Sequence, residues 1–374
     1  MVRLILALVL LLLSLLILFR APTNWLWYVS ILVTEFSLLF VLLSLLIIFI
    51  KSGGSKYYLL SSILAFIALI IFLIPFVQAY NINRKLDKNF SAVFKRKEGA
   101  NDETPFAISR LLKGIGAKKF PYQKLIYDET NKLQLDFYKP VGKGPRPCVI
   151  VIHGGSWAGG DSQQLPELNT ELAKAGYAVA SINYRLAPRS HYPAPLEDVQ
   201  QCLDYLATHA AALSLDTNNF VLLGRSAGGQ VAMSAAYTRN DPRIKGVISF
   251  YGPSDMIWGY QNPTSPLVLN SRKIMEDYLG GSLDEVPQLY EHSSATETVT
   301  AHTPPTLLIY GENDPLVSHL HATRLSKKLK AHRIPYFELY LPWATHGFDY
   351  TLYGPGGQIS TWTVKAFLKS VTGG

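Results

Sequence analysis

The first 83 residues consist of long apolar runs separated by short polar breaks. Three runs carry no charged side chain: 4–19, 36–50 and 57–83. A helix needs about 20 apolar residues to cross the hydrocarbon core of a membrane. The third run meets this length, the second meets it if it begins near Tyr28, and the first is marginal. The pattern therefore predicts about three transmembrane helices within residues 1–83.

The first run has an alternative interpretation as a cleavable signal peptide. It opens with Met1-Val2-Arg3 and has an apolar core, as signal peptides do. Residues 20–23 offer no convincing small-x-small cleavage site, and further apolar runs follow. We therefore favour three spanning helices over a signal peptide followed by two.

Several side chains of the second run suit a membrane interface. Trp25, Trp27 and Tyr28 would form an interfacial belt on the second helix. Glu35 lies within about two turns of the start of that helix. This position favours a carboxylate that reaches back to the interface over an intramembrane functional group.

The basic residues predict an orientation. With three spans, one side holds Arg3, Lys51 and Lys56, whereas the other holds Arg20 and the cluster Arg84, Lys85, Lys88, Lys95, Arg96 and Lys97. The positive-inside rule then places the rest of the chain in the cytoplasm. A charged segment that lies on anionic lipid is the alternative. Residues 84–120 are expected to form a juxtamembrane basic linker with a turn or break at 98–105.

From residue 121 to 374, strand-like and helix-like patterns alternate. Residues 124–128 and 133–138 alternate apolar and polar side chains, which predicts an antiparallel hairpin. Later apolar runs such as 148–152 and 306–310 are followed by helical stretches. This order predicts a largely parallel sheet with helices on both faces and the hairpin at its edge.

Charge and cysteine content exclude some function classes. The net charge of +8 lies partly in the predicted linker and indicates attraction to a membrane surface, and no basic-aromatic pattern indicates nucleic acid. Cys148 and Cys202 fall in a predicted strand and helix, so we expect buried thiols. No residue spacing indicates a metal site, and we expect no metal and no organic cofactor.

The strongest chemical signal is the sequence LLGRSAGG at residues 222–229. An apolar strand here ends in Gly-x-Ser-x-Gly and leads directly into a helix rich in small residues. Such a turn holds the serine in strained backbone geometry and lifts its hydroxyl above the sheet, and the glycines avoid a clash with Cβ. Ser226 is therefore predicted to be a nucleophile.

A serine nucleophile requires a general base and a group that orients the base. His346 lies in a loop after the extended stretch 336–340, and Asp314 follows the strand at 306–310. The chain order Ser, Asp, His is the order found in α/β-hydrolases. We predict that Ser226, Asp314 and His346 form a catalytic triad.

The developing oxyanion also needs donors. His153-Gly154-Gly155 follows the strand at 148–152, and glycine lets the backbone approach a substrate closely. The amides of Gly154 and Gly155, together with that of Ala227, are the expected oxyanion hole. His153 is expected to brace this loop.

Together these motifs resemble those of α/β-hydrolase esterases of the hormone-sensitive-lipase-like and BD-FAE-like group, from about residue 123 to residue 371. NYRLAP at 183–188 and YPAPLEDV at 192–199 are similar to the signature of this group after its second core strand, which implies a structural role for Asp198. Lipase-like members carry a third glycine where this chain has Ser156-Trp157. That form is nearer to the BD-FAE and kynurenine-formamidase-like members.

The resemblance implies an α/β-hydrolase fold with a cap insertion at about 252–304. Trp157, beside the predicted oxyanion hole, and Trp258, in the predicted cap, are expected to contact substrate, and no cofactor is expected. The expected function is a membrane-anchored serine hydrolase that cleaves small-molecule or lipid carboxylic esters through an acyl-enzyme. Acyl transfer or amide hydrolysis on the same triad, or a non-catalytic membrane binding protein, are the alternatives.

Overall fold

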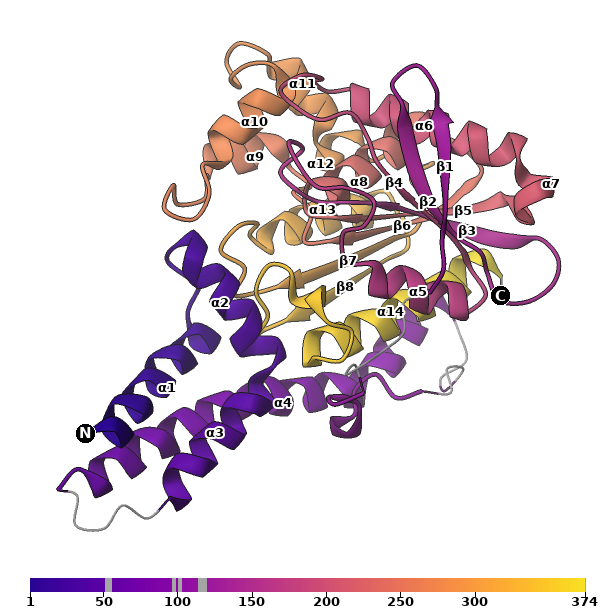
Figure 1. The fold of residues 1–374 in the computed structure, drawn as a ribbon. Helices are drawn as coiled ribbons and strands as arrows, with labels where there is room; N and C mark the ends of the chain where they lie inside the picture. Colours follow the sequence, from indigo (N-terminus) through magenta and orange to yellow (C-terminus); the bar gives the residue numbers. More distant parts are fainter. Residues whose placement is uncertain (51–55, 96–98, 100–102, 114–119, 374) are drawn as a thin grey trace.

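A narrow helical bundle projects from a larger α/β domain (Figure 1). The computed structural model describes residues 1–50, 56–95, 99, 103–113 and 120–373. The amino terminus lies at the far tip of the bundle, and the carboxyl terminus lies on the α/β domain. Half of the predicted break at 98–105 lies outside the described residues, as does Lys51.

The α/β domain is built on one eight-stranded sheet with the order β1-β2-β4-β3-β5-β6-β7-β8. Strands β1 and β2 form an antiparallel hairpin at one edge, and β2 is antiparallel to β4. The other neighbours are parallel. This arrangement confirms the predicted parallel sheet with an antiparallel edge. The strands are β1 (Gln123–Asp128), β2 (Leu133–Tyr138), β3 (Arg146–Ile152), β4 (Ala178–Ile182), β5 (Leu215–Arg225), β6 (Ile244–Phe250), β7 (Thr306–Gly311) and β8 (Tyr336–Leu341).

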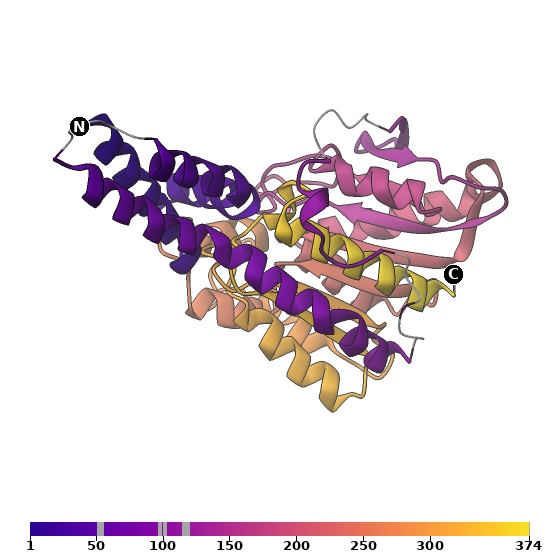
Figure 2. The same cartoon turned by 90° about the horizontal axis from the view of Figure 1, so that it is seen from below.

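Helices cover both faces of the sheet, as Figures 1 and 2 show. Helices α5 and α14 lie on the face that also receives the second half of α4, and α6 and α8 pack together on the other face. The central strands are buried over most of their length, as expected where both faces are covered. The helices are α5 (Pro166–Lys174), α6 (Ala194–Thr208), α7 (Ala210–Leu213), α8 (Ala227–Arg239), α13 (Leu320–Ala331) and α14 (Pro355–Thr372).

Four further helices lie between β6 and β7, where the sequence predicts the cap. Asp255 begins the first of them, because its side chain accepts a hydrogen bond from the amide of Trp258 at 2.8 Å. Side chains of the first two cap helices line a cavity that also contains Ser226. The cap helices are α9 (Met256–Gln261), α10 (Ser271–Leu279), α11 (Pro287–Ser293) and α12 (Ala295–Thr298).

The amino-terminal bundle contains α1 (Val2–Leu18), α2 (Asn24–Glu35), α3 (Ser37–Phe49) and the first half of α4 (Tyr58–Phe94). Of the described helices, α4 alone is long and apolar enough by itself to cross a membrane. Helices α2 and α3 would form a second candidate only as one span bent by 80°, and α1 is shorter. By length and composition the described helices thus offer one or two candidate spans, where the sequence predicts about three.

Glu35, the last residue of α2 before the bend to α3, contacts the α/β domain. This side chain is 3% exposed, and its Oε2 accepts a hydrogen bond from the amide of Gly356 at 2.9 Å. Burial is the largest effect on this group and raises the pKa of Glu35 to about 8, whereas the amides of Gly356 and Gly357 at the start of α14 lower it. Glu35 thus attaches α2 to the start of α14, and the prediction that it reaches the membrane interface is wrong.

Helix α4 continues ten residues beyond Arg84, into the segment predicted as a linker. Its polar half packs on the α/β domain. The Phe90 ring lies 5.1 Å from that of Phe337 on β8, and the Phe94 ring lies 5.4 Å from that of Phe367 on α14. The bundle is therefore joined to the sheet by a continuous helix.

Candidate active site

Ser226 occupies a strained turn between β5 and α8. Its backbone has φ 53° and ψ −122°, a region that is costly for residues other than glycine. A Cβ on Gly224 would lie 2.0 Å from the carbonyl oxygen of Gly228, and one on Gly228 would lie 2.2 Å from that of Ile152. The turn therefore requires both glycines. Ser226 is partly exposed, whereas the residues on either side of it are buried.

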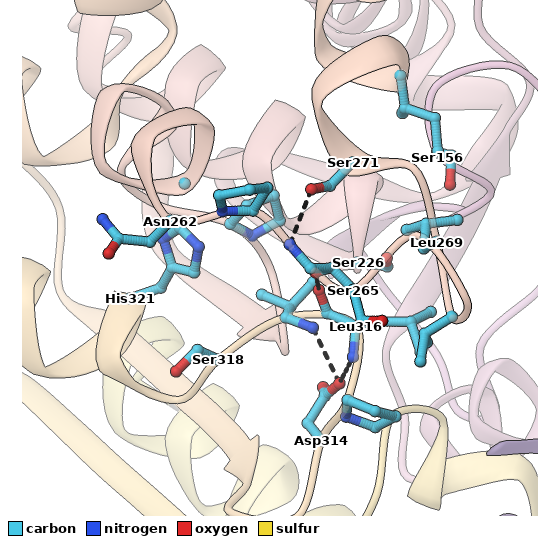
Figure 3. Close-up of a pocket in the computed structure, with 18 of the residues that line it drawn as sticks. Ser156, Ser226, Asn262, Ser265, Leu269, Ser271, Asp314, Leu316, Ser318 and His321 are labelled. Atoms are coloured by element: carbon cyan, nitrogen blue, oxygen red, sulfur yellow. Dashed lines mark hydrogen bonds between the residues drawn. The ribbon is translucent and has the colours of Figure 1, made fainter. Parts of the chain in front are cut away.

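Asp314 and His346 form a buried pair. Nδ1 of His346 lies 2.6 Å from Oδ2 of Asp314. The other carboxylate oxygen accepts hydrogen bonds from the amides of Leu316 and Val317 at 2.7 and 2.9 Å (Figure 3). These contacts fix the carboxylate in the loop after β7. A neutral imidazole that donates from Nδ1 has Nε2 left as an acceptor.

Two cavities meet at Ser226. The first, of about 660 Å³, lies between the cap and the loop after β7 and is also lined by Asp314 (Figure 3). The second, of about 740 Å³, is also lined by His346 and by side chains of α2. Both cavities are in the size range of small-molecule sites. The three residues of the predicted triad are thus found in the walls of two adjoining cavities.

The two predicted substrate-contact tryptophans line the first cavity. Trp157 is 4% exposed, its Nε1 donates to Oε1 of Gln230 at 3.0 Å, and its ring stacks on Tyr278 at 4.4 Å. Trp258 packs edge-on against His321 at 4.9 Å. Their contact with substrate stays a prediction.

The loop after β3 provides candidate oxyanion donors. The amide of Gly154 already donates to Oε1 of Gln164 at 2.7 Å. In the part of the chain that the structure describes, the amides of Gly155, Ser156 and Ala227 take part in no hydrogen bond. Sequence reasoning noted Ser156 only as a departure from a glycine and did not find Gln164, because that contact depends on a loop that has no motif.

His153 supports the same loop. It is buried, its ring stacks on Tyr184 at 4.4 Å, and its Nδ1 lies 2.7 Å from the carbonyl oxygen of Gly154. Burial lowers the pKa of His153 below its ordinary value. Across the described residues, no cluster of three His, Cys, Asp or Glu side chains is placed to hold a metal ion.

A buried ionic network lies beside the His346 loop. Nε of Arg225 lies 2.5 Å from Oδ2 of Asp349, and the Tyr251 hydroxyl donates to the other carboxylate oxygen. Burial opposes the charge of Arg225, but the Asp349 carboxylate holds its pKa above the ordinary value. The Tyr251 ring packs on His346 at 4.3 Å. Apart from the nearness of Asp349 to His346, no sequence pattern indicates this network.

The amino-terminal segment also contacts the loops that carry Asp314 and His346. Nε1 of Trp27 donates to the carbonyl oxygen of His346 at 2.9 Å. Asn313, next to Asp314, donates to the carbonyl oxygen of Ile17 at 2.6 Å. Trp27 therefore lies against the site, and its place in an interfacial belt stays a prediction. Apolar character alone could not distinguish the two positions.

Comparisons with known proteins agree with this architecture. The chain is 28% identical over 221 residues to the probable carboxylic ester hydrolase LipM of Mycobacterium tuberculosis, covering 55% of this chain and 50% of LipM. It is 27% identical over 250 residues to the esterase LipC of the same organism, covering 61% of this chain and 60% of LipC. The chain thus spans about half to three fifths of the length of these relatives.

Solved structures show the fold. An esterase of Pyrobaculum calidifontis has a TM-score of 0.61 at 20% identity, and the match covers 77% of this chain and 92% of the esterase chain. A bacterial heroin esterase has a TM-score of 0.60 at 21% identity, and the match covers 79% of this chain and 93% of the heroin esterase chain. These likenesses identify an α/β-hydrolase fold. The BD-FAE family model matches residues 135–329, more than half of the sequence, and the chain belongs to the BD-FAE family.

Proposed function

We propose that the chain is a serine hydrolase that cleaves carboxylic esters. The observation that carries this proposal is the strained turn that presents Ser226 where two cavities meet, with the Asp314–His346 pair in their walls. The names of LipM and LipC support the same chemistry. The substrate is a small-molecule or lipid ester.

The reaction proceeds through an acyl-enzyme. Oγ of Ser226 attacks the ester carbonyl carbon while Nε2 of His346 takes the hydroxyl proton, and Asp314 stabilises the resulting imidazolium. Collapse of the tetrahedral intermediate breaks the bond to the leaving oxygen, which receives the proton from His346 as an alcohol. Water then attacks the acyl-enzyme with His346 as base, and the acid leaves as Ser226 regains its proton.

The oxyanion hole is assigned to the amides of Gly155 and Ala227, with Ser156 as a third donor. Backbone amides directed at a developing oxyanion act without reorganisation during the reaction. The Gly154 amide is left out because Gln164 engages it. The hydrogen bond between the Gly154 amide and Gln164 holds the loop in place.

We also propose that α1, α3 and the apolar half of α4 insert into a membrane. Their outward side chains are apolar over most of their length. Helix α1, with 17 residues, is about 26 Å long, close to the roughly 30 Å hydrocarbon core. Arg3, near the tip, donates to the carbonyl oxygen of Ile47 at 2.7 Å and to Oγ of Ser62 at 2.8 Å, which joins the three helices. The cytoplasmic side of the α/β domain stays a prediction.

A covalent serine probe tests the proposed chemistry. The purified full-length protein should be labelled by a fluorophosphonate and should hydrolyse p-nitrophenyl butyrate, and Ser226→Ala should lose both activities. Ser190→Ala is the matched control, because Ser190 is also partly exposed but lies outside both cavities. Equal labelling of wild type and Ser226→Ala would refute the assignment. A folded wild type that is neither labelled nor active would indicate a binding protein.

A further inference from the structure

Helix α2 contributes one part of the lining of the second cavity. Its lining side chains are aromatic or aliphatic: Trp27, Tyr28, Ile31, Leu32 and Phe36, the last at the bend that follows the helix. The same cavity is lined by Ser226, His346 and Gly155. The cavity therefore joins the proposed nucleophile to an apolar surface that lies outside residues 135–329, the segment matched by the family model.

The wall is fixed in place along its whole length. Trp27 donates to the carbonyl oxygen of His346 at 2.9 Å, and Oγ of Ser30 donates to Oγ1 of Thr345 at 3.1 Å. At the other end, Glu35 accepts from the start of α14. Three separated polar contacts to the α/β domain make α2 part of the site. It differs in this respect from a helix that serves only as an anchor.

The rim of the cavity continues into the proposed membrane helices. Tyr28, Leu32 and Phe36 line the cavity and are still 54%, 47% and 39% exposed. After the bend, Leu39 and Leu42 on α3 are 52% and 55% exposed. An apolar surface that continues over two helices is unfavourable in water and is typical of contact with lipid or a partner. The mouth of the cavity thus lies at the boundary between the α/β domain and the bundle.

We propose that the second cavity binds the acyl chain of an ester lipid drawn from the bilayer, with the chain along α2 and its carbonyl carbon at Ser226. This inference rests on the proposed ester hydrolysis and specifies its substrate class. The first cavity then receives the alcohol part, because its rim carries the polar side chains of Asn262, Ser265, Ser271 and Ser318 (Figure 3). The two cavities separate the two halves of the ester at the nucleophile.

Chain-length dependence tests this proposal with the full-length protein in phosphatidylcholine vesicles. Each methylene that enters an apolar cavity should raise kcat/KM about fourfold, so p-nitrophenyl laurate should greatly exceed p-nitrophenyl acetate. Leu32→Trp fills the rim and should lower kcat/KM for laurate at least tenfold more than for acetate. Leu39→Trp is the matched control, because Leu39 is similarly exposed but lines neither cavity. It should leave both rates within twofold.

A lipid probe identifies the source of the acyl chain. Wild type should release oleate from dioleoylglycerol placed in the same vesicles, and Leu32→Trp should lower this release by the factor found with laurate. A second variant, Leu32→Ser, removes apolar contact without filling the cavity and should also lower the laurate rate selectively. An unchanged Tm shows that each variant is folded.

The outcomes separate the two proposals. A wild type that hydrolyses acetate but gains nothing with chain length, or a Leu32→Trp variant that lowers acetate and laurate equally, overturns the acyl-chain assignment and leaves ester hydrolysis intact. Laurate hydrolysis without release of oleate from dioleoylglycerol overturns the bilayer source. Failure of wild type on every ester overturns the proposed function itself.

Discussion

The buried Arg225–Asp349 pair allows a quantitative test of how the site is held together. The two side chains are 2% and 1% exposed, and Nε lies 2.5 Å from Oδ2. Asp349→Leu would remove the carboxylate and leave the guanidinium buried without its counter-charge. Removal of one partner of a buried pair costs about 3–5 kcal/mol. In a domain of this size, 1 kcal/mol corresponds to about 2–4 °C in Tm, so Tm should fall by roughly 6–20 °C.

A double-mutant cycle isolates the pair from its surroundings. Arg225→Met with Asp349→Leu replaces both charges by apolar side chains, which is often neutral or stabilising for a buried pair. The double variant should therefore recover most of the lost stability. The assay is thermal unfolding of the full-length protein in detergent, followed by tryptophan fluorescence, for the wild type, both single variants and the double variant.

The same cycle can refute the reasoning. A fall in Tm of less than 2 °C for Asp349→Leu would mean that Arg225 is not held as a buried ion pair. A double variant with a lower Tm than both single variants would mean that the ion pair stabilises the fold. The free energy gained by no longer burying the two charges would then be smaller than the free energy lost with the pair. Either result would contradict the account of the network beside His346.

Three further predictions concern single residues. A Cβ on Gly228 would lie 2.2 Å from the carbonyl oxygen of Ile152. Gly228→Ala should therefore displace Ser226 and lower kcat for p-nitrophenyl acetate about 100-fold. A loss of less than threefold would contradict this displacement. Trp27→Phe removes the donor to His346 and should lower kcat about fivefold with KM unchanged; an unchanged kcat would show that this bond does not position the base. Burial lowers the pKa of His321 from 6.5 to about 4, so the unfolded state binds the proton more readily. The free energy of unfolding should therefore fall by about 3 kcal/mol as the pH drops from 6.5 to 4. His321→Gln should lose this pH dependence in unfolding experiments at several pH values, and a pH dependence that is retained would belong to other groups.

The sequence predicted those parts of the fold that depend on local pattern. The edge hairpin follows from the alternation at 124–128 and 133–138, and the parallel strands follow from apolar runs separated by helical stretches. Gly224 and Gly228 predicted the turn at Ser226, because a sharp strand-to-helix turn of this kind has no room for Cβ atoms at these two positions. These features are set by neighbours in the chain.

The features that the sequence did not predict depend on distant contacts. An apolar helix has the same composition whether it faces lipid or packs on a protein domain, so nothing in the local pattern around Trp27 and Glu35 indicated their contacts with His346 and Gly356. The hydrogen bond from the Gly154 amide to Gln164, ten residues further along the chain, lies in a loop that has no motif. The contacts of Trp27 and Glu35 join positions 319 and 321 residues apart, and they become visible only when those segments are brought together.

The most direct test of the central claim is to observe the acyl group on Ser226. The full-length protein would be mixed briefly with excess p-nitrophenyl butyrate, quenched in acid, digested and analysed by mass spectrometry. The account predicts a butyryl group on the peptide that contains Ser226, which appears with a burst of p-nitrophenol and decays with turnover. Turnover without acylation of Ser226, or acylation of another residue that precedes product release, would contradict it.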